Sequence, residues 1–221
     1  MHGQYEHDVP RAAARRVDGE KKSLIATEQD PRARAAWWEE MVAVPAERLV
    51  FVDETGTHTR MTPLYGRAPR GQRAYGHVPR NHTHNTTLVA ALTLVGPDAP
   101  MVLEGAMDRE AFLAWLRHFL VPTLSAGQVV VMDNLNVHKG TQVRAMIEAA
   151  GCELVYLPAY SPDFSPIEGA YSKVKTRVRR AGKRTQGELE AAIGEAVGAV
   201  TVRDARGWFA HCGYRLSGQS S

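Results

Sequence analysis

Residues 129–168 read VVVMDNLNVHKGTQVRAMIEAAGCELVYLPAYSPDFSPIE, and apolar runs of strand length alternate there with helix-like segments. Residues 128–133 and 152–158 have the length and apolar content of buried strands, whereas residues 141–150 and 165–182 have helical spacing. A helix between two strands is the usual connection of a parallel pair, and such crossovers are right-handed. This stretch therefore predicts parallel strands covered by helices.

The residues before this stretch predict three further strands. Residues 48–54 form an apolar run without polar alternation, which is typical of a strand covered on both faces. Residues 86–96 and 101–107 also have strand character, and Gly96-Pro97-Asp98 suggests the turn of a hairpin between them. Three antiparallel strands, then helix, strand, helix, strand and helix, predict an α/β fold with a mixed sheet flanked by helices.

The remaining segments complete the predicted organisation. Asp108 is expected to cap a helix over residues 108–124, whose apolar face includes Phe112 and Phe119. Asp30 is expected to cap a second helix that begins at a proline and continues to about residue 42. We expect a flexible leader at residues 1–22, a helical linker segment at 23–46, one α/β domain with C-terminal helices at 47–216, and a flexible tail at 217–221.

Three carboxylates stand where this topology places binding sites. Asp53 is expected to end the first predicted strand and Asp133 to end the fourth, and Glu168 lies in the first turn of the helix after the last strand. Sites in such sheets form at the carboxyl ends of the strands. Each acid also has a purely structural interpretation: the aspartates suit turns, and Ser165 with Glu168 forms a capping-box pattern.

The three acids together favour a metal site. Three negative charges in one small volume are costly unless protons or cations neutralise them. Oxygen ligands without cysteine favour Mg²⁺ or Mn²⁺, and two such ions can activate a nucleophile and stabilise the leaving oxygen of a phosphodiester. The polar residues Asn134, Asn136 and His138, just past a buried strand, are expected to orient the carboxylate ligands.

The basic residues are unevenly distributed, although the net charge is only +3. Residues 55–97 and 169–187 contain no aspartate or glutamate, and together they hold twelve lysines and arginines. Two acid-free basic blocks indicate an anionic partner, most simply DNA. The predicted DNA contacts are Arg60, Arg67, Arg70, Arg73, Arg80, Lys139, Lys173, Lys175, Arg177, Arg179 and Arg180.

The composition argues against a membrane or secreted protein. Only Cys152 and Cys212 are present, and no C-x-x-C pair occurs. No stretch approaches 18 apolar residues, and the N-terminus lacks the apolar region of a signal peptide. A soluble, cytoplasmic and nucleoid-associated protein is predicted.

Three segments together resemble a known family. FVDET at residues 51–55, MDNLNVHK at 132–139 and LPAYSPDFSPIE at 157–168 resemble the signature motifs of DDE transposases of the mariner-like superfamily. Between Asp133 and Glu168 lie 34 residues, the spacing of the branch carried by bacterial insertion sequences. The resemblance covers about residues 21–180.

The resemblance implies a ribonuclease-H-like fold with Asp53, Asp133 and Glu168 as the metal-binding catalytic triad; Asp163 is not among the family's catalytic acids. It also implies hydrolysis at transposon ends, attack of the freed 3′-hydroxyl on target DNA, and a homodimer acting on double-stranded DNA. Relatives carry N-terminal helix-turn-helix modules that recognise the element's ends, and from its short polar leader we expect this chain to lack them.

Three other interpretations remain open. A stand-alone nuclease or resolvase of the same fold would share the metal chemistry without strand transfer. A truncated, inactive element product would bind nucleic acid only. A histidine-based metallohydrolase would use His58, His77, His82 and His84, but the suggestive pair His82 and His84 lacks the acidic partner usually needed within a few residues.

Overall fold

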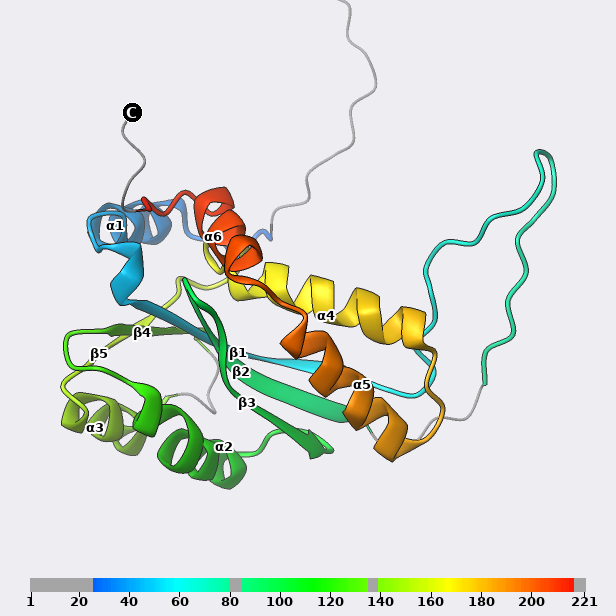
Figure 1. Cartoon of the computed structure of the whole chain (residues 1–221). Helices are drawn as coiled ribbons and strands as arrows, with labels where there is room; N and C mark the ends of the chain where they lie inside the picture. The colour runs from blue at the N-terminus through cyan, green and yellow to red at the C-terminus, as the bar shows by residue number, and fades with distance from the viewer. Residues whose placement is uncertain (1–25, 80–84, 135–138, 217–221) are drawn as a thin grey trace, which may run out of the picture.

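The computed structural model describes residues 26–79, 85–134 and 139–216, which form a central sheet between two layers of helices (Figure 1). The sheet order is β3-β2-β1-β4-β5, and β1 is antiparallel to β2 but parallel to β4. The strands are β1 (Leu49–Thr57), β2 (Thr86–Thr93), β3 (Gly96–Glu104), β4 (Val129–Met132) and β5 (Glu153–Tyr156). The predicted α/β fold with a mixed sheet is confirmed.

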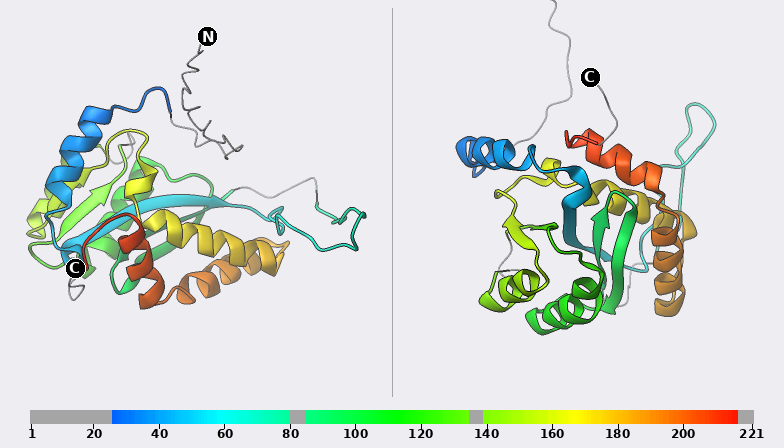
Figure 2. Two further views of the ribbon diagram at one scale, coloured as in Figure 1. Left: turned by 90° about the horizontal axis from the view of Figure 1, so that it is seen from above. Right: turned by 60° about the vertical axis from the view of Figure 1, so that its left-hand side comes forward.

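Helices cover both faces of this sheet, as two further views also show (Figure 2). On one face lie α2 (Arg109–Trp115) and α3 (Thr141–Ala149); on the other lie α1 (Pro31–Met41), α4 (Ile167–Ala181), α5 (Gln186–Gly198) and α6 (Val202–His211). Side chains of β1 alternate between the two cores, because Phe51 packs with the α4 layer and Val52 with the α2 layer. This double coverage explains why residues 48–54 show no polar alternation.

The hairpin between β2 and β3 is confirmed, but its predicted turn is wrong. Gly96 pairs with Thr93, so the two-residue loop is Leu94-Val95, and the predicted turn residues already belong to β3. Leu94 is buried in the core, which fixes the register, and Gly96 adopts a φ of 125° that suits glycine.

The helix predicted from Asp108 begins as expected but changes its pitch. The Asp108 carboxylate accepts a hydrogen bond from the N–H of Ala111 at 2.8 Å, and α2 continues into a π-helical turn over Leu116–Leu120. A π turn adds a residue relative to α-helical spacing, so Leu120 is buried and Phe119 is 44% exposed. The prediction that Phe119 belongs to the apolar face is therefore wrong.

Between β1 and β2 the chain leaves the sheet as a long loop. Residues 58–79 contain no helix or strand, and the loop extends away from the body beyond the C-terminal end of α4 (Figure 1). Its base is fixed by Arg184, whose guanidinium donates to the carbonyls of Thr59 (2.6 Å) and Met61 (3.1 Å).

Among the described residues, every helix is too short or too polar to cross a lipid bilayer.

Candidate active site

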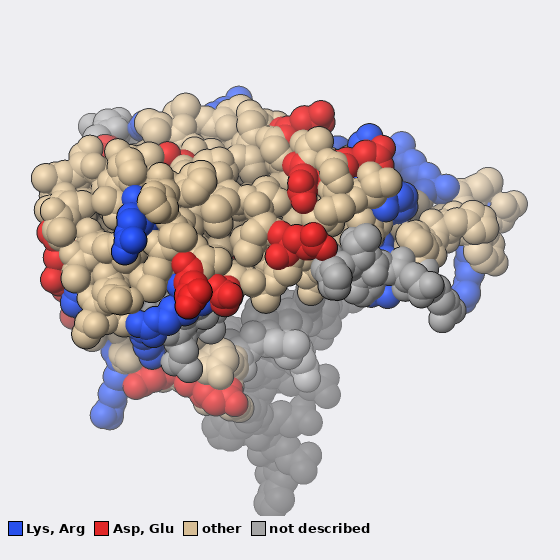
Figure 3. Space-filling model, turned by 90° about the horizontal axis from the view of Figure 1, so that it is seen from below, with Lys and Arg blue, Asp and Glu red and all other residues tan. Residues whose placement is uncertain are grey.

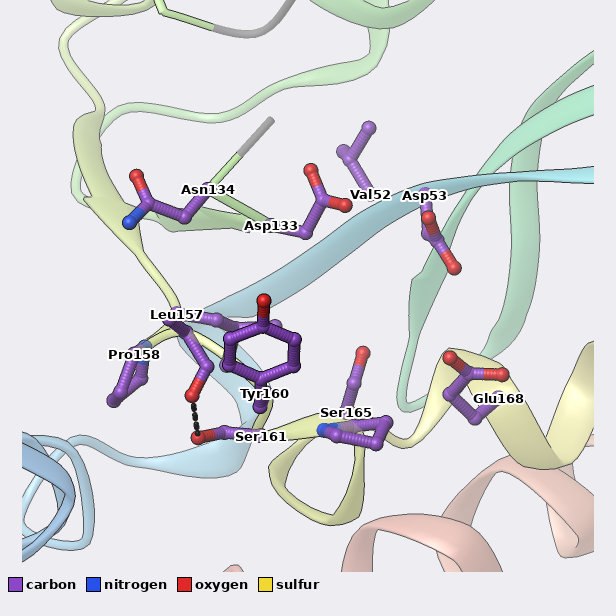
Figure 4. Close-up of a pocket in the computed structure, with 12 residues that line it drawn as sticks. Val52, Asp53, Asp133, Asn134, Leu157, Pro158, Tyr160, Ser161, Ser165 and Glu168 are labelled. Atoms are coloured by element: carbon purple, nitrogen blue, oxygen red, sulfur yellow. Dashed lines mark hydrogen bonds between the residues drawn. The ribbon is translucent and has the colours of Figure 1, made fainter. Parts of the chain in front are cut away.

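Asp53, Asp133 and Glu168 line one cavity of about 390 Å³ next to the end of β4. Asp53 and Glu168 point toward each other from β1 and α4, and Asp133 follows β4 directly (Figure 4). Three residues far apart in the chain are thus brought to one site, as the topology predicts. The other lining residues are Val52, Asn134, Leu157, Pro158, Ala159, Tyr160, Ser161, Pro162 and Ser165.

The position of Asp53 differs from the prediction. Asp53 does not end its strand, because β1 continues to Thr57 and pairs with β2 throughout that extension. Pairing of β1 with β4 ends at Val52 and Met132. Asp53 is therefore the first residue of β1 beyond the parallel pair, and the cavity opens where β4 stops.

The capping-box interpretation of Glu168 is wrong. The N-cap of α4 is Pro166, with helical backbone angles, and it contributes no side-chain hydrogen bond. The main-chain N–H of Ser165 donates to the carbonyl of Pro162, and that of Glu168 donates to the carbonyl of Ser165. Main-chain bonds therefore replace both bonds of a capping box, and the Glu168 carboxylate faces the cavity instead.

The pKa of Asp53 is raised from 3.8 to about 7. Burial is the main cause; a hydrogen bond from the main chain of Glu54 opposes it, and the negative charges of Glu168 and Asp133 raise the pKa further. A divalent cation would remove this cost, and three carboxylates form a donor set that suits Mg²⁺ or Mn²⁺. Within the described ranges no three acidic, histidine or cysteine side chains already form a metal-binding group. The three carboxylates thus line the cavity but do not converge on one common point.

The helical turn that carries Glu168 packs closely against α6. A Cβ atom on Gly169 would lie 2.5 Å from Cδ1 of Trp208, so only glycine allows this approach. One turn later, Lys173 forms an ion pair of 2.5 Å with Asp204 and holds the pKa of Asp204 far below its usual range. Lys173, predicted to contact DNA, thus binds α6 in this structure.

Asp163 is held outside the acidic cavity. Its carboxylate accepts two hydrogen bonds from Arg34 of α1, at 3.0 and 2.6 Å, and this contact lowers its pKa. The Arg34 guanidinium also lies 4.0 Å above the ring of Phe164. Asp163 therefore joins the turn before α4 to α1, and its carboxylate does not line the acidic cavity.

Tyr160 is a site residue that sequence reasoning did not single out. Its side chain lines the cavity, and its backbone has a φ of 57°, which is rare for residues other than glycine. Gln29 donates to the Tyr160 carbonyl at 2.6 Å. Strained backbone of this kind is common at functional sites. The motif YSPDFSP, which begins at Tyr160, is the sequence signal that could have identified this residue.

The other predicted site residues are only partly described. Asn134 lines the cavity, whereas Asn136, His138 and Arg80 lie outside the described residues, as do His82 and His84 of the histidine alternative. The remaining predicted DNA contacts lie on the loop and on α4, apart from Lys139, which is exposed before α3.

A family profile described as "DDE superfamily endonuclease" matches residues 48–190, more than half of the chain. The chain belongs to this family. Comparison with curated protein sequences gave no significant match.

Solved structures share the fold of this DDE superfamily endonuclease. The pre-cleavage Mos1 transpososome matches with a TM-score of 0.70 and 15% identity, covering 89% of this chain and 64% of that chain. The Mos1 strand transfer complex matches with a TM-score of 0.70 and 17% identity, covering 89% and 63%. The catalytic domain of Mos1 mariner transposase matches with a TM-score of 0.56 and 13% identity, covering 87% and 92%. These matches confirm the ribonuclease-H-like fold, and this chain spans about 64% of the length of the Mos1 chain in the transpososome.

Proposed function

We propose that this chain is the catalytic domain of a DNA transposase that hydrolyses phosphodiester bonds at transposon ends and joins them to target DNA. The observation that carries the proposal is the single cavity lined by Asp53, Asp133 and Glu168 in a member of the DDE endonuclease family. The 34-residue spacing supports the bacterial insertion-sequence branch. We place the catalytic domain at residues 47–216, after a linker at 23–46.

Asp53, Asp133 and Glu168 would hold two divalent ions, with Asn134, Asn136 and His138 orienting the carboxylates. When bound, Mg²⁺ or Mn²⁺ ions lower the pKa of a nucleophile and offset charge on the leaving oxygen. Because the pKa of Asp53 lies near 7 without metal, cation binding would release a proton from this side chain near neutral pH. Mos1 paired-end complexes with Mn and with Mg are among the similar structures.

Double-stranded DNA is the proposed substrate, because an acidic cavity needs basic surroundings to hold a polyanion. The loop of residues 58–79 supplies one such surface. It contains four arginines and no lysine, aspartate or glutamate. Viewed from below, the loop forms an arm with basic charge only, whereas the adjacent body carries both signs (Figure 3). Paired DNA ends in the Mos1 assemblies support a homodimer here.

Replacing Arg67, Arg70 and Arg73 with alanine is expected to weaken DNA binding and its salt dependence. All three side chains are exposed on the loop, so their removal should leave folding unchanged. The slope of log affinity against log salt should fall by about 0.9 for each phosphate that the variant no longer neutralises. Fluorescence anisotropy with a labelled duplex at several salt concentrations measures this slope. An unchanged slope would assign the loop another role.

The structure divides the basic residues of α4 between two sides of the helix. Lys175 and Arg179 lie two and three turns after Glu168, so they share the side of the helix that leads to the cavity. Arg177 and Arg180 instead share the side of Lys173, which binds α6. DNA that enters the cavity would therefore meet Lys175 and Arg179 first.

A matched pair of double variants tests this division. Lys175→Ala with Arg179→Ala should lower affinity for duplex DNA about 10-fold at 0.1 M salt, because two phosphates are then left without a cationic partner. Arg177→Ala with Arg180→Ala removes the same charge from the same helix and should change affinity less than about 3-fold. Equal decreases in an anisotropy titration would mean that net charge, rather than the side of the helix, determines binding.

A labelled oligonucleotide assay with Mg²⁺ tests the proposed function itself. Strand transfer produces DNA longer than the input, together with nicked substrate, and this outcome is expected. Short products alone would favour the stand-alone nuclease. DNA binding without any nicking would favour the inactive element product.

A further inference from the structure

Tyr171 links the two chain segments that carry Asp53 and Glu168. It lies in α4, three residues after Glu168, and only 4% of it is exposed. Its hydroxyl donates a hydrogen bond to the main-chain carbonyl of Asp53. This hydrogen bond joins the first turns of α4 to β1 at Asp53, the first of the three acids.

The surroundings of Tyr171 make this link well defined. Its ring packs in the core beside Ile167 and Val174 of the same helix and near Ala90 of β2, so its position is fixed. Burial and the negative charges of Asp53 and Glu168 raise the pKa of Tyr171 well above its usual value.

We propose that Tyr171 is a positioning residue whose hydrogen bond sets the separation of the Asp53 and Glu168 carboxylates and hence their affinity for a divalent cation. The inference rests on the proposed metal-dependent function, because the acids line the cavity without forming a closed metal-binding group among the described residues. In such a site, a small change in the distance between β1 and α4 changes how well both carboxylates reach one cation.

Tyr171→Phe removes the hydroxyl and keeps the ring, so the core packing is retained. Tyr214→Phe is a matched control: Tyr214 is also buried, and its hydroxyl donates to the main-chain carbonyl of Phe164 at 2.7 Å. Both variants lose one buried hydrogen bond, and comparable decreases in thermal stability are expected without metal. Only Tyr171→Phe should bind Mn²⁺ more weakly, by about 10-fold, since residues that orient metal ligands have effects of this size.

Isothermal titration of the full chain with Mn²⁺ alone, without DNA, measures the affinity directly. Affinity equal to wild type in Tyr171→Phe would overturn the positioning role and leave the bond a purely structural one. Equal decreases of affinity in both variants would overturn it as well, because the effect would then follow stability. Absence of Mn²⁺ binding by the wild-type chain would instead contradict the proposed metal-dependent function, and the positioning role would fall with it.

Discussion

Replacing Asp133 with asparagine is expected to reduce Mg²⁺-dependent nicking by about 10³-fold or more, since groups that act as one catalytic unit have effects of this size. Asparagine keeps the shape of the side chain but removes one of the three carboxylates that line the cavity. DNA affinity should stay equal or rise slightly, because a charge that repels phosphate is removed. A nicking assay and an anisotropy titration on the same labelled duplex separate the two effects.

Asp163→Asn is the matched control for this variant. Asp163 carries the same side chain a few residues before Glu168, but it binds Arg34 and does not line the acidic cavity. Nicking by Asp163→Asn should stay within a few-fold of wild type, provided that the assay temperature lies below its unfolding transition. Retained nicking in Asp133→Asn would contradict the assignment of Asp53, Asp133 and Glu168 as the catalytic acids.

Replacing Asp53 with asparagine is expected to stabilise the metal-free protein at alkaline pH. The pKa of Asp53 is about 7 in the folded chain against a reference value of 3.8, so the folded state binds its proton more tightly. The wild-type free energy of unfolding should therefore fall as pH rises from about 4 to about 7, and this contribution is constant above that range. Asparagine cannot ionise and does not share this decrease.

The expected gain for Asp53→Asn at pH 8 is about 1–3 kcal/mol, because a shift of about three pKa units sets an upper limit near 4 kcal/mol and water at the cavity reduces it. Urea unfolding in a chelator at pH 4 and pH 8 measures it, and the two proteins should differ little at pH 4. Added Mn²⁺ should reverse the order at pH 8, since it stabilises only the chain that binds it well. Parallel pH profiles would show that the pKa of Asp53 is not raised in the folded chain.

Local sequence patterns predicted much of the fold. Asp30 and Asp108 cap their helices as expected, because a capping bond joins residues only two or three positions apart. The local predictions of the hairpin turn and of the place of Phe119 in the fold were wrong. The hairpin turn lies at Leu94-Val95, with Leu94 buried, and not at the predicted residues. The π-helical turn leaves Phe119 exposed.

In the candidate site too, local sequence patterns predicted some features and long-range packing determined others. Local sequence was enough to predict the order of strands and helices, the two acid-free basic blocks, and the three acids near the ends of particular elements. Long-range packing determines that Glu168 faces a cavity rather than a helix end, that Asp163 binds Arg34 of α1, and that Tyr171 reaches Asp53. Propensity and spacing act over a few neighbouring residues, whereas these outcomes depend on how β1, α1 and α4 pack across long separations in the chain. No local pattern contains that information.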